Sequence, residues 1–308
     1  MIGTFLRLAV SVAVLAVLFA LMDTEAILIR LRGADAGWLA AAVCVLTILT
    51  FLMARRWQLT AIALGFDLSF RTAVSEYYIA QWLNLVLPGG MAGDAARAVR
   101  LRKGGDLKRA AQTVIIERLI GQSTLFMMMF VGFTVALLVP SGIPWPVSTW
   151  AWLALGVAVA VTAVLFARRE GRAARFIDTA LRLMRRPQQV VLSALIAVLI
   201  SVAFYACARA TGTVLPVAAL FTLIPLLLTA MLIPFSVGGW GWREGAAAAL
   251  FPLTGALPSA GVAAGIAYGA MMLVAALPAV VLLVLSPRKG RSADQADEPE
   301  REARKGDK

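Results

Sequence analysis

The chain has 308 residues, of which 61% are hydrophobic and only 15% are charged, and its net charge is +12. A soluble protein is about a quarter charged, so this composition excludes an ordinary water-soluble globule and indicates an integral membrane protein. Histidine is absent, and Cys44 and Cys207 lie in separate apolar runs. We therefore expect no metal, no cofactor and no disulfide framework. The basic residues flank apolar runs, which is typical of membrane topology and not of nucleic-acid binding.

Uncharged runs long enough to cross a bilayer predict the membrane helices in chain order. The first runs are 8–22 and 36–54, and Arg55, Arg56 and Trp57 are expected to mark a membrane surface after the second. The later runs, several of them divided by proline and glycine, are 119–167, 187–208, 210–242 and 245–287. The predicted fold is all-α: a polytopic helical membrane protein with about eight transmembrane helices and one or two re-entrant or broken helices.

The sequence predicts one membrane domain, residues 1–287, followed by a charged tail, 288–308, that is too polar to fold. Lysine and arginine gather in the tail and in the segments 97–109 and 168–186. The loops assigned to the opposite side hold three arginines in all: Arg30, Arg32 and Arg209. The excess of positive charge predicts that both termini are cytoplasmic and that the protein lies in the cytoplasmic membrane.

Residues 72–93 are apolar, yet basic segments on the same side of the membrane flank them. We therefore expect a re-entrant helix and loop, which the membrane tolerates only where protein or trapped water satisfies the backbone. The entering helix carries Tyr77, Gln81 and Asn84 at helical spacing. This spacing predicts one polar stripe that faces something other than lipid.

The loop that follows is the first predicted helix break. Proline ends the entering helix, glycines allow unusual backbone conformations, and Asp94 is expected to cap a new helix that carries Arg97. Free amides at the start of that helix, together with the arginine, suit a phosphate group. The residues expected to act as hinges here are Pro88, Gly89, Gly90 and Gly93. The alternative is a plain glycine-rich turn between two packed helices.

A second break repeats this plan in the other half of the chain. Its expected hinge residues are Pro234, Gly238, Gly239 and Gly241, and Arg243 and Glu244 begin a short helix to Leu250. Two helix breaks with ionisable residues indicate the central site of a transporter. The similarity between the halves is too slight to decide whether they are inverted repeats.

Two further groups of charged residues lie outside the helix breaks. Glu117 and Arg118 lie where an isolated charge is costly; either they pair with each other or with the breaks, or they lie at the membrane surface. The segment 168–186 places apolar residues on one helical face and arginines on the rest. We expect this helix to lie in the cytoplasmic interface, where it either attracts anionic lipid or only fixes the topology.

These motifs resemble the transmembrane part of the lysylphosphatidylglycerol synthase family. The members of this family are flippase-like membrane proteins. The resemblance spans roughly residues 5–285 and rests on the segments 84–90, 93–97, 117–118 and 233–244. It implies movement of a lipid or lipid-linked sugar between leaflets. Bifunctional members carry a soluble aminoacyltransferase domain after the membrane part, which is not expected here.

We expect a lipid translocase rather than an enzyme, with an anionic, aminoacylated or polyprenyl-linked cargo. The expected cargo-binding residues are Asn84, Asp94, Arg97, Glu117, Arg118, Arg243 and Glu244. One alternative is a membrane-embedded transferase in which a carboxylate acts as general base. The other is a non-catalytic partner of glycosyltransferases. Cargo, coupling and oligomeric state stay open.

Overall fold

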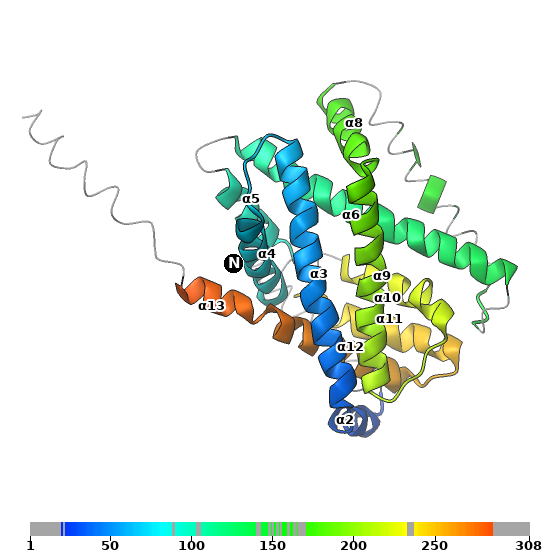
Figure 1. Ribbon diagram of the computed structural model, residues 1–308. Helices are drawn as coiled ribbons and strands as arrows, with labels where there is room; N and C mark the ends of the chain where they lie inside the picture. Colours follow the sequence, from blue (N-terminus) through cyan, green and yellow to red (C-terminus); the bar gives the residue numbers. More distant parts are fainter. Residues whose placement is uncertain are drawn as a thin grey trace, which may run out of the picture.

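The computed structural model describes residues 20, 22–87, 90–102, 106–139, 143–146, 171–232 and 237–285, with scattered residues between 149 and 165. All regular structure in these segments is helical, and no strand occurs among them. Figure 1 shows long helices crossing one another, with several short helices gathered at one end. The predicted all-α class is therefore confirmed.

Two long helices, α3 (Ala36–Ala63) and α9 (Pro187–Ala210), run antiparallel along each other at the centre (Figure 1). At one end Gln189 Nε2 donates to Thr60 Oγ1 at 3.0 Å. At the other end the amide of Asp35 donates to the carbonyl of Ala210 at 2.9 Å. Small and aliphatic side chains fill the contact, and Cys207 lies in this core as a free, buried thiol.

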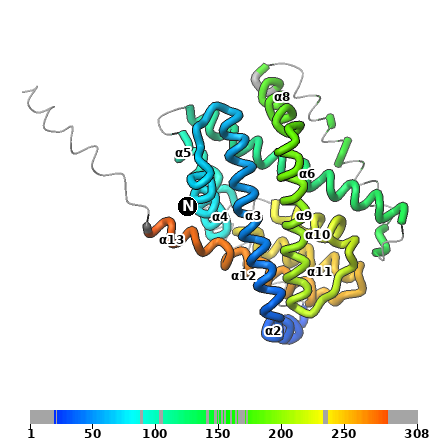
Figure 2. Tube along the Cα trace, viewed as in Figure 1, coloured from blue at the N-terminus to red at the C-terminus, as the bar shows by residue number. Residues whose placement is uncertain are grey.

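Shorter elements surround one end of this pair. Their bounds are α2 Thr24–Arg32, η1 Val217–Leu220, α10 Leu223–Thr229, η2 Ala230–Leu232, α11 Trp242–Leu250 and η3 Phe251–Thr254. The helix α12 (Pro258–Ala276) packs against α3, α9 and α11. The helix α13 (Pro278–Leu285) continues from α12 and passes α4 (Phe70–Val86), as Figure 2 shows. Proline at the first position of α9 and α12 suits a helix start, because the missing amide has no partner there.

The remaining helices build the part of the molecule that holds most of the charge. They are α4 Phe70–Val86, α5 Ala92–Leu101, α6 Leu107–Leu138 and α8 Arg172–Met184. The pair α4 and α5 folds back on itself and packs against α3 and α6. This helix–break–helix unit agrees with the expected shape of residues 72–93.

Four described helices are long and apolar enough to cross a membrane: α3, α6, α9 and the continuous stretch Pro258–Val284. The expected number of about eight is thus not reached within the described residues. The predicted span 8–22 and most of the second half of 119–167 lie outside them. Hydropathy predicted one span over residues 210–242, but the described part of this run folds into η1, a short turn, and then α10 followed directly by η2.

One further expectation needs correction. The helix α3 does not end before Arg55 but continues to Ala63, so that Arg56 and Trp57 lie inside it and are buried. In α8, Ala180 and Leu183 form a buried cluster with Ile116 and Ile120 of α6, so part of this helix packs against protein. Protein contact satisfies the same hydrophobic driving force that a membrane surface would.

Candidate functional site

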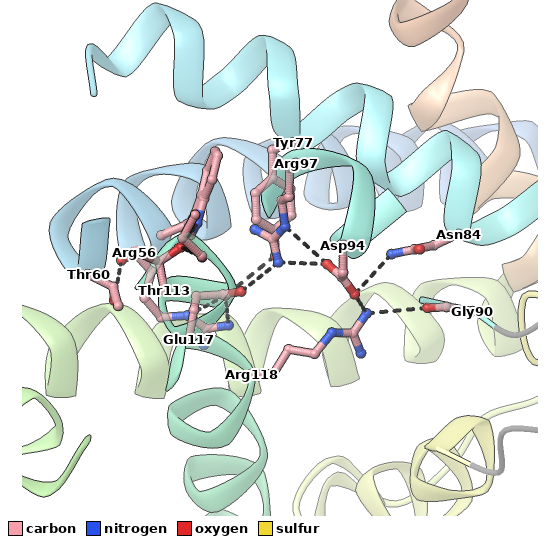
Figure 3. Close-up of polar contacts among 12 residues, drawn as sticks. Arg56, Thr60, Tyr77, Asn84, Gly90, Asp94, Arg97, Thr113, Glu117 and Arg118 are labelled. Carbon is pink, nitrogen blue, oxygen red and sulfur yellow. Dashed lines mark hydrogen bonds and ion pairs between the residues drawn. The ribbon is translucent and has the colours of Figure 1, made fainter. Parts of the chain in front are cut away.

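Five charged side chains form one continuous chain of ion pairs where α3, α4, α5 and α6 meet (Figure 3). Their signs alternate in the order Arg56, Glu117, Arg97, Asp94, Arg118. They come from three different helices, α3, α5 and α6, so only the tertiary structure brings them together. Each acid lies between two arginines.

Glu117 is the inner acid of this charged chain and is only 1% exposed. Its Oε1 accepts from Arg56 Nε at 3.0 Å and from Arg56 Nη2 at 2.5 Å. Its Oε2 accepts from Arg97 Nη2 at 3.0 Å. Since α6 begins at Leu107 and a helix rises about 1.5 Å per residue, this carboxylate lies about 15 Å along the helix. Glu117 therefore pairs with arginines of two other helices, which is one of the two arrangements expected for it.

Arg97 is the central arginine, and its guanidinium lies against two aromatic rings. Its guanidinium carbon lies 4.9 Å from the ring centroid of Trp57 and 4.6 Å from that of Tyr77. Trp57 is itself fixed by a hydrogen bond from its Nε1 to Thr113 Oγ1 at 3.1 Å. Such cation–π contacts are strongest where water is excluded, so this arginine is preorganised before any ligand arrives.

Asp94 is the second acid and joins α5 to α6. Arg97 donates to its Oδ1 from Nε at 3.0 Å and from Nη2 at 2.7 Å. Its Oδ2 pairs with Arg118 and accepts from Asn84 Nδ2 at 3.4 Å. Arg118 Nη2 also donates to the carbonyl of Gly90 at 3.4 Å. Glu117 and Arg118 thus pair with residues of the other helices and of the first break, and not with each other.

The charged chain lines a cavity of about 480 Å³. Tyr77, Gln81 and Asn84 line it as well, as expected for the polar stripe of α4. Three buried guanidinium nitrogens in this wall have no hydrogen-bond partner: Arg56 Nη1, Arg97 Nη1 and Arg118 Nε. Because a buried unpaired donor is costly, the cavity is prepared for an acceptor, and three cations against two acids favour an anion.

The two helix breaks meet at this cavity. Gly90 and Met91 of the first break and Gly238 and Gly239 of the second are all in its lining. Gly238 has a φ of +56°, and a Cβ on it would lie 2.8 Å from the carbonyl oxygen of Leu85 at the end of α4. The expected shared chamber between the two breaks is therefore present.

Two of the described backbone amides at the breaks are already paired and not free for a ligand. The amide of Gly93 donates to Asn84 Oδ1 at 2.8 Å, and that of Gly241 donates to Glu244 Oε2 at 2.6 Å. Met91, and not Asp94, is the cap residue of α5. A buried amide takes the nearest acceptor, so side chains of the protein satisfy these two. Arginine side chains supply the free donors instead.

Arg243 and Glu244 lie behind the cavity wall and not in it. Both are 0% exposed, and they pair with each other through Arg243 Nε and Glu244 Oε1 at 3.0 Å. The Arg243 guanidinium packs on Trp240 and on Tyr268, with centroid distances of 4.9 and 5.6 Å. Tyr268 does line the cavity. The expectation that Arg243 and Glu244 contact a headgroup directly does not fit this arrangement, whereas support of the wall does.

Of the other expected hinges, Pro88, Gly89 and Pro234 lie outside the described residues. Sequence reasoning missed Arg56 as a member of the site, because its position after a long apolar run is that of an ordinary surface arginine. It also missed Gln122, whose Oε1 is buried without a partner and which lines the same cavity. Its spacing of four residues from Arg118 could have placed both on one face of α6.

Comparison with known proteins agrees with the sequence motifs. No curated protein and no solved structure matches the chain. A family model described as the lysylphosphatidylglycerol synthase TM region matches residues 4–288. This match includes both breaks and the whole charged chain, so the protein belongs to the lysylphosphatidylglycerol synthase transmembrane family.

Proposed function

We propose that this protein moves an anionic phospholipid or lipid-linked glycan between the leaflets of the cytoplasmic membrane. The observation that carries the proposal is the alternating charged chain in the cavity, with three buried nitrogens free to donate. A polar chamber among apolar helices gives a headgroup a route that the hydrocarbon core does not. Membership in the lysylphosphatidylglycerol synthase transmembrane family supports a membrane lipid as the cargo.

The acids have a separate role in this proposal. Without a ligand, Asp94 and Glu117 neutralise most of the arginine charge and keep the guanidiniums in place. When a phosphate arrives, it accepts from donor edges that the acids leave free, so little side-chain order has to be created. Each carboxylate is already paired with two arginines, so neither is free to contact a substrate proton. We therefore infer transport and not a transferase reaction.

The two breaks are the parts that we propose to move. Gly238 touches the end of α4, so a change in either break alters the wall of the same chamber. Broken helices around a central site are the usual framework of alternating access. The arginine-rich α8 lies at the same end of the bundle as the start of α9 and α6, which supports a cytoplasmic orientation of that end.

The proposal is tested with the purified chain in liposomes that contain a fluorescent phosphatidylglycerol, by measuring how fast dithionite gains access to the inner-leaflet label. Arg118→Met is the informative variant, because its side chain is 37% exposed and its loss should leave the fold intact. Losing a charge-assisted hydrogen bond of about 1.5–3 kcal/mol should slow translocation about tenfold or more. Arg175→Met on the exposed face of α8 is the matched control. Wild-type rates in Arg118→Met would refute the proposed route.

A further inference from the structure

We propose that the protein holds a resident phospholipid outside the charged cavity, in an apolar groove between α6 and α9. One acyl chain lies in the groove, the phosphate lies at the start of α9, and a headgroup hydrogen-bond donor reaches Gln189. The ligand class is a phospholipid whose headgroup carries an N–H or O–H donor. This inference goes beyond the proposed transport, because the described lining residues of the groove and of the cavity are all different.

The groove has the chemistry and the length that an acyl chain needs. Its volume is about 740 Å³, and the described residues that line it include no charged side chain. On α9 the lining runs from Gln189 to Val198. At about 1.5 Å per residue this is about 14 Å, roughly half of a hydrocarbon core of about 30 Å. The groove can therefore take one chain of a lipid from a single leaflet.

Gln189 places a buried acceptor at one end of this groove. Its side chain is fixed, because Nε2 donates to Thr60 Oγ1 at 3.0 Å and to the carbonyl of Arg56 at 3.3 Å. The residue is only 1% exposed, and its Oε1 has no hydrogen-bond partner. A buried acceptor without a partner is costly. An acyl chain cannot satisfy it, whereas an N–H or O–H group of a headgroup can.

The same end of the groove suits a phosphate. Met184 lines the groove, and the exposed Arg185 and Arg186 follow it directly. Among the described residues, neither arginine takes part in an ion pair. Arg186 is also the first cap residue of α9 and makes no side-chain cap hydrogen bond. The first amides of a helix lack partners within it and attract anions.

One headgroup can reach both features. Gln189 follows Arg186 by three residues, and residues at this spacing are neighbours on one helix face. A phosphate at Arg186 and a donor at Gln189 are thus separated by about one helical turn. These charges and the buried acceptor favour a phospholipid as the occupant over an apolar helix of another protein, which would bring neither an anion nor a donor.

The test compares two lipids with identical acyl chains, phosphatidylethanolamine and phosphatidylcholine. Binding of each to the full chain is measured by native mass spectrometry. Both lipids carry a phosphate and no net charge, but only phosphatidylethanolamine has N–H donors. We expect it to bind about threefold or more better, from one additional hydrogen bond. Since neither lipid is a net anion, the anion preference proposed for the charged cavity does not enter this ratio.

Two variants test the acceptor and the groove separately. Gln189→Met should bring the ratio of the two lipids to about one, whereas a mere loss of packing would weaken both lipids alike and keep the ratio. Ala194→Phe fills the groove from α9 and should weaken both lipids about tenfold or more. Val191→Phe is its matched control, because this residue is 65% exposed on the same helix and does not line the groove.

A third variant tests the position of the phosphate. The double variant Arg185→Gln/Arg186→Gln should weaken both lipids about twofold or more and leave their ratio unchanged. Arg175→Gln is the control, since Arg175 is exposed near the other end of α8. Wild-type binding in the double variant would overturn the proposed phosphate position.

The remaining outcomes also decide the inference. Equal binding of the two lipids to the wild-type chain, or an unchanged ratio in Gln189→Met, would overturn the role of Gln189. Wild-type lipid binding by Ala194→Phe would overturn the groove as the site of the acyl chain. A dimer that dissociates in Ala194→Phe without a change in lipid binding would assign the groove to a second copy of the chain and refute the lipid.

Discussion

Arg97 and Glu117 form an ion pair 3.0 Å long although 20 residues separate them, and they are only 2% and 1% exposed. The pair links the helix that follows the first break to the long helix α6. Since both residues have further partners of opposite charge, neither can be changed without affecting the others. Stability and ligand binding are therefore coupled at this point.

Replacing the acid of this pair should destabilise the protein strongly. Glu117→Gln leaves Arg56 and Arg97 buried with too little negative charge, and breaking a buried pair costs about 3–5 kcal/mol. The free energy of unfolding is measured by denaturant titration in micelles. The double variant Arg56→Met/Glu117→Met should recover part of the loss, and Asp178→Asn on the exposed face of α8 should change little. A double variant less stable than Glu117→Gln would contradict the proposed charge balance.

Gly93→Ala tests the close packing of α4 and α5. A Cβ at this position would collide with the backbone carbonyl of Ala80, and backbone cannot rotate away as a side chain can. We expect a loss of about 1–3 kcal/mol or more, from overpacking. Gly156→Ala is the control, since nothing lies within 4 Å of its Cβ position. Equal melting temperatures for the two variants would show that the helices can separate freely.

Alanine substitutions at two glycines, compared with each other, measure the effect of the contact between the second break and the end of α4. Gly238 and Gly255 both have a positive φ, +56° and +77°, so alanine strains the backbone at both, by about 1–2 kcal/mol. Only Gly238 has a neighbour, the carbonyl of Leu85. Gly238→Ala should therefore lower both stability and translocation rate more than Gly255→Ala does. If the two variants behave alike in both measurements, the contact has no role.

Arg243→Met separates support of the cavity wall from contact with the ligand. The side chain is fully buried and pairs with Glu244, so its loss should cost about 3–5 kcal/mol. The double variant Arg243→Met/Glu244→Met should regain much of this stability. Under conditions where the variant stays folded, we expect its affinity for phosphatidylglycerol to remain within about twofold of wild type. A tenfold loss of affinity would place Arg243 in contact with the headgroup after all.

The sequence by itself determined that the chain is an all-helical membrane protein and located both helix breaks. These features are local: hydropathy depends on composition, and proline and glycine act on their own backbone. It also indicated Asp94, Arg97, Glu117 and Arg118 as ionisable residues near the first break.

Only the tertiary structure decided which of these charges meet. From the sequence, Arg56 is expected at the surface, but in the structure α3 continues past it and packs against α6. Arg243 is expected to bind the headgroup, but its contacts with aromatic rings place it behind Tyr268. An ion pair between residues 61 positions apart, such as Arg56 with Glu117, has no signature in the sequence. Its formation depends on how whole helices pack, because side chains distant along the chain become neighbours only when apolar faces are buried together.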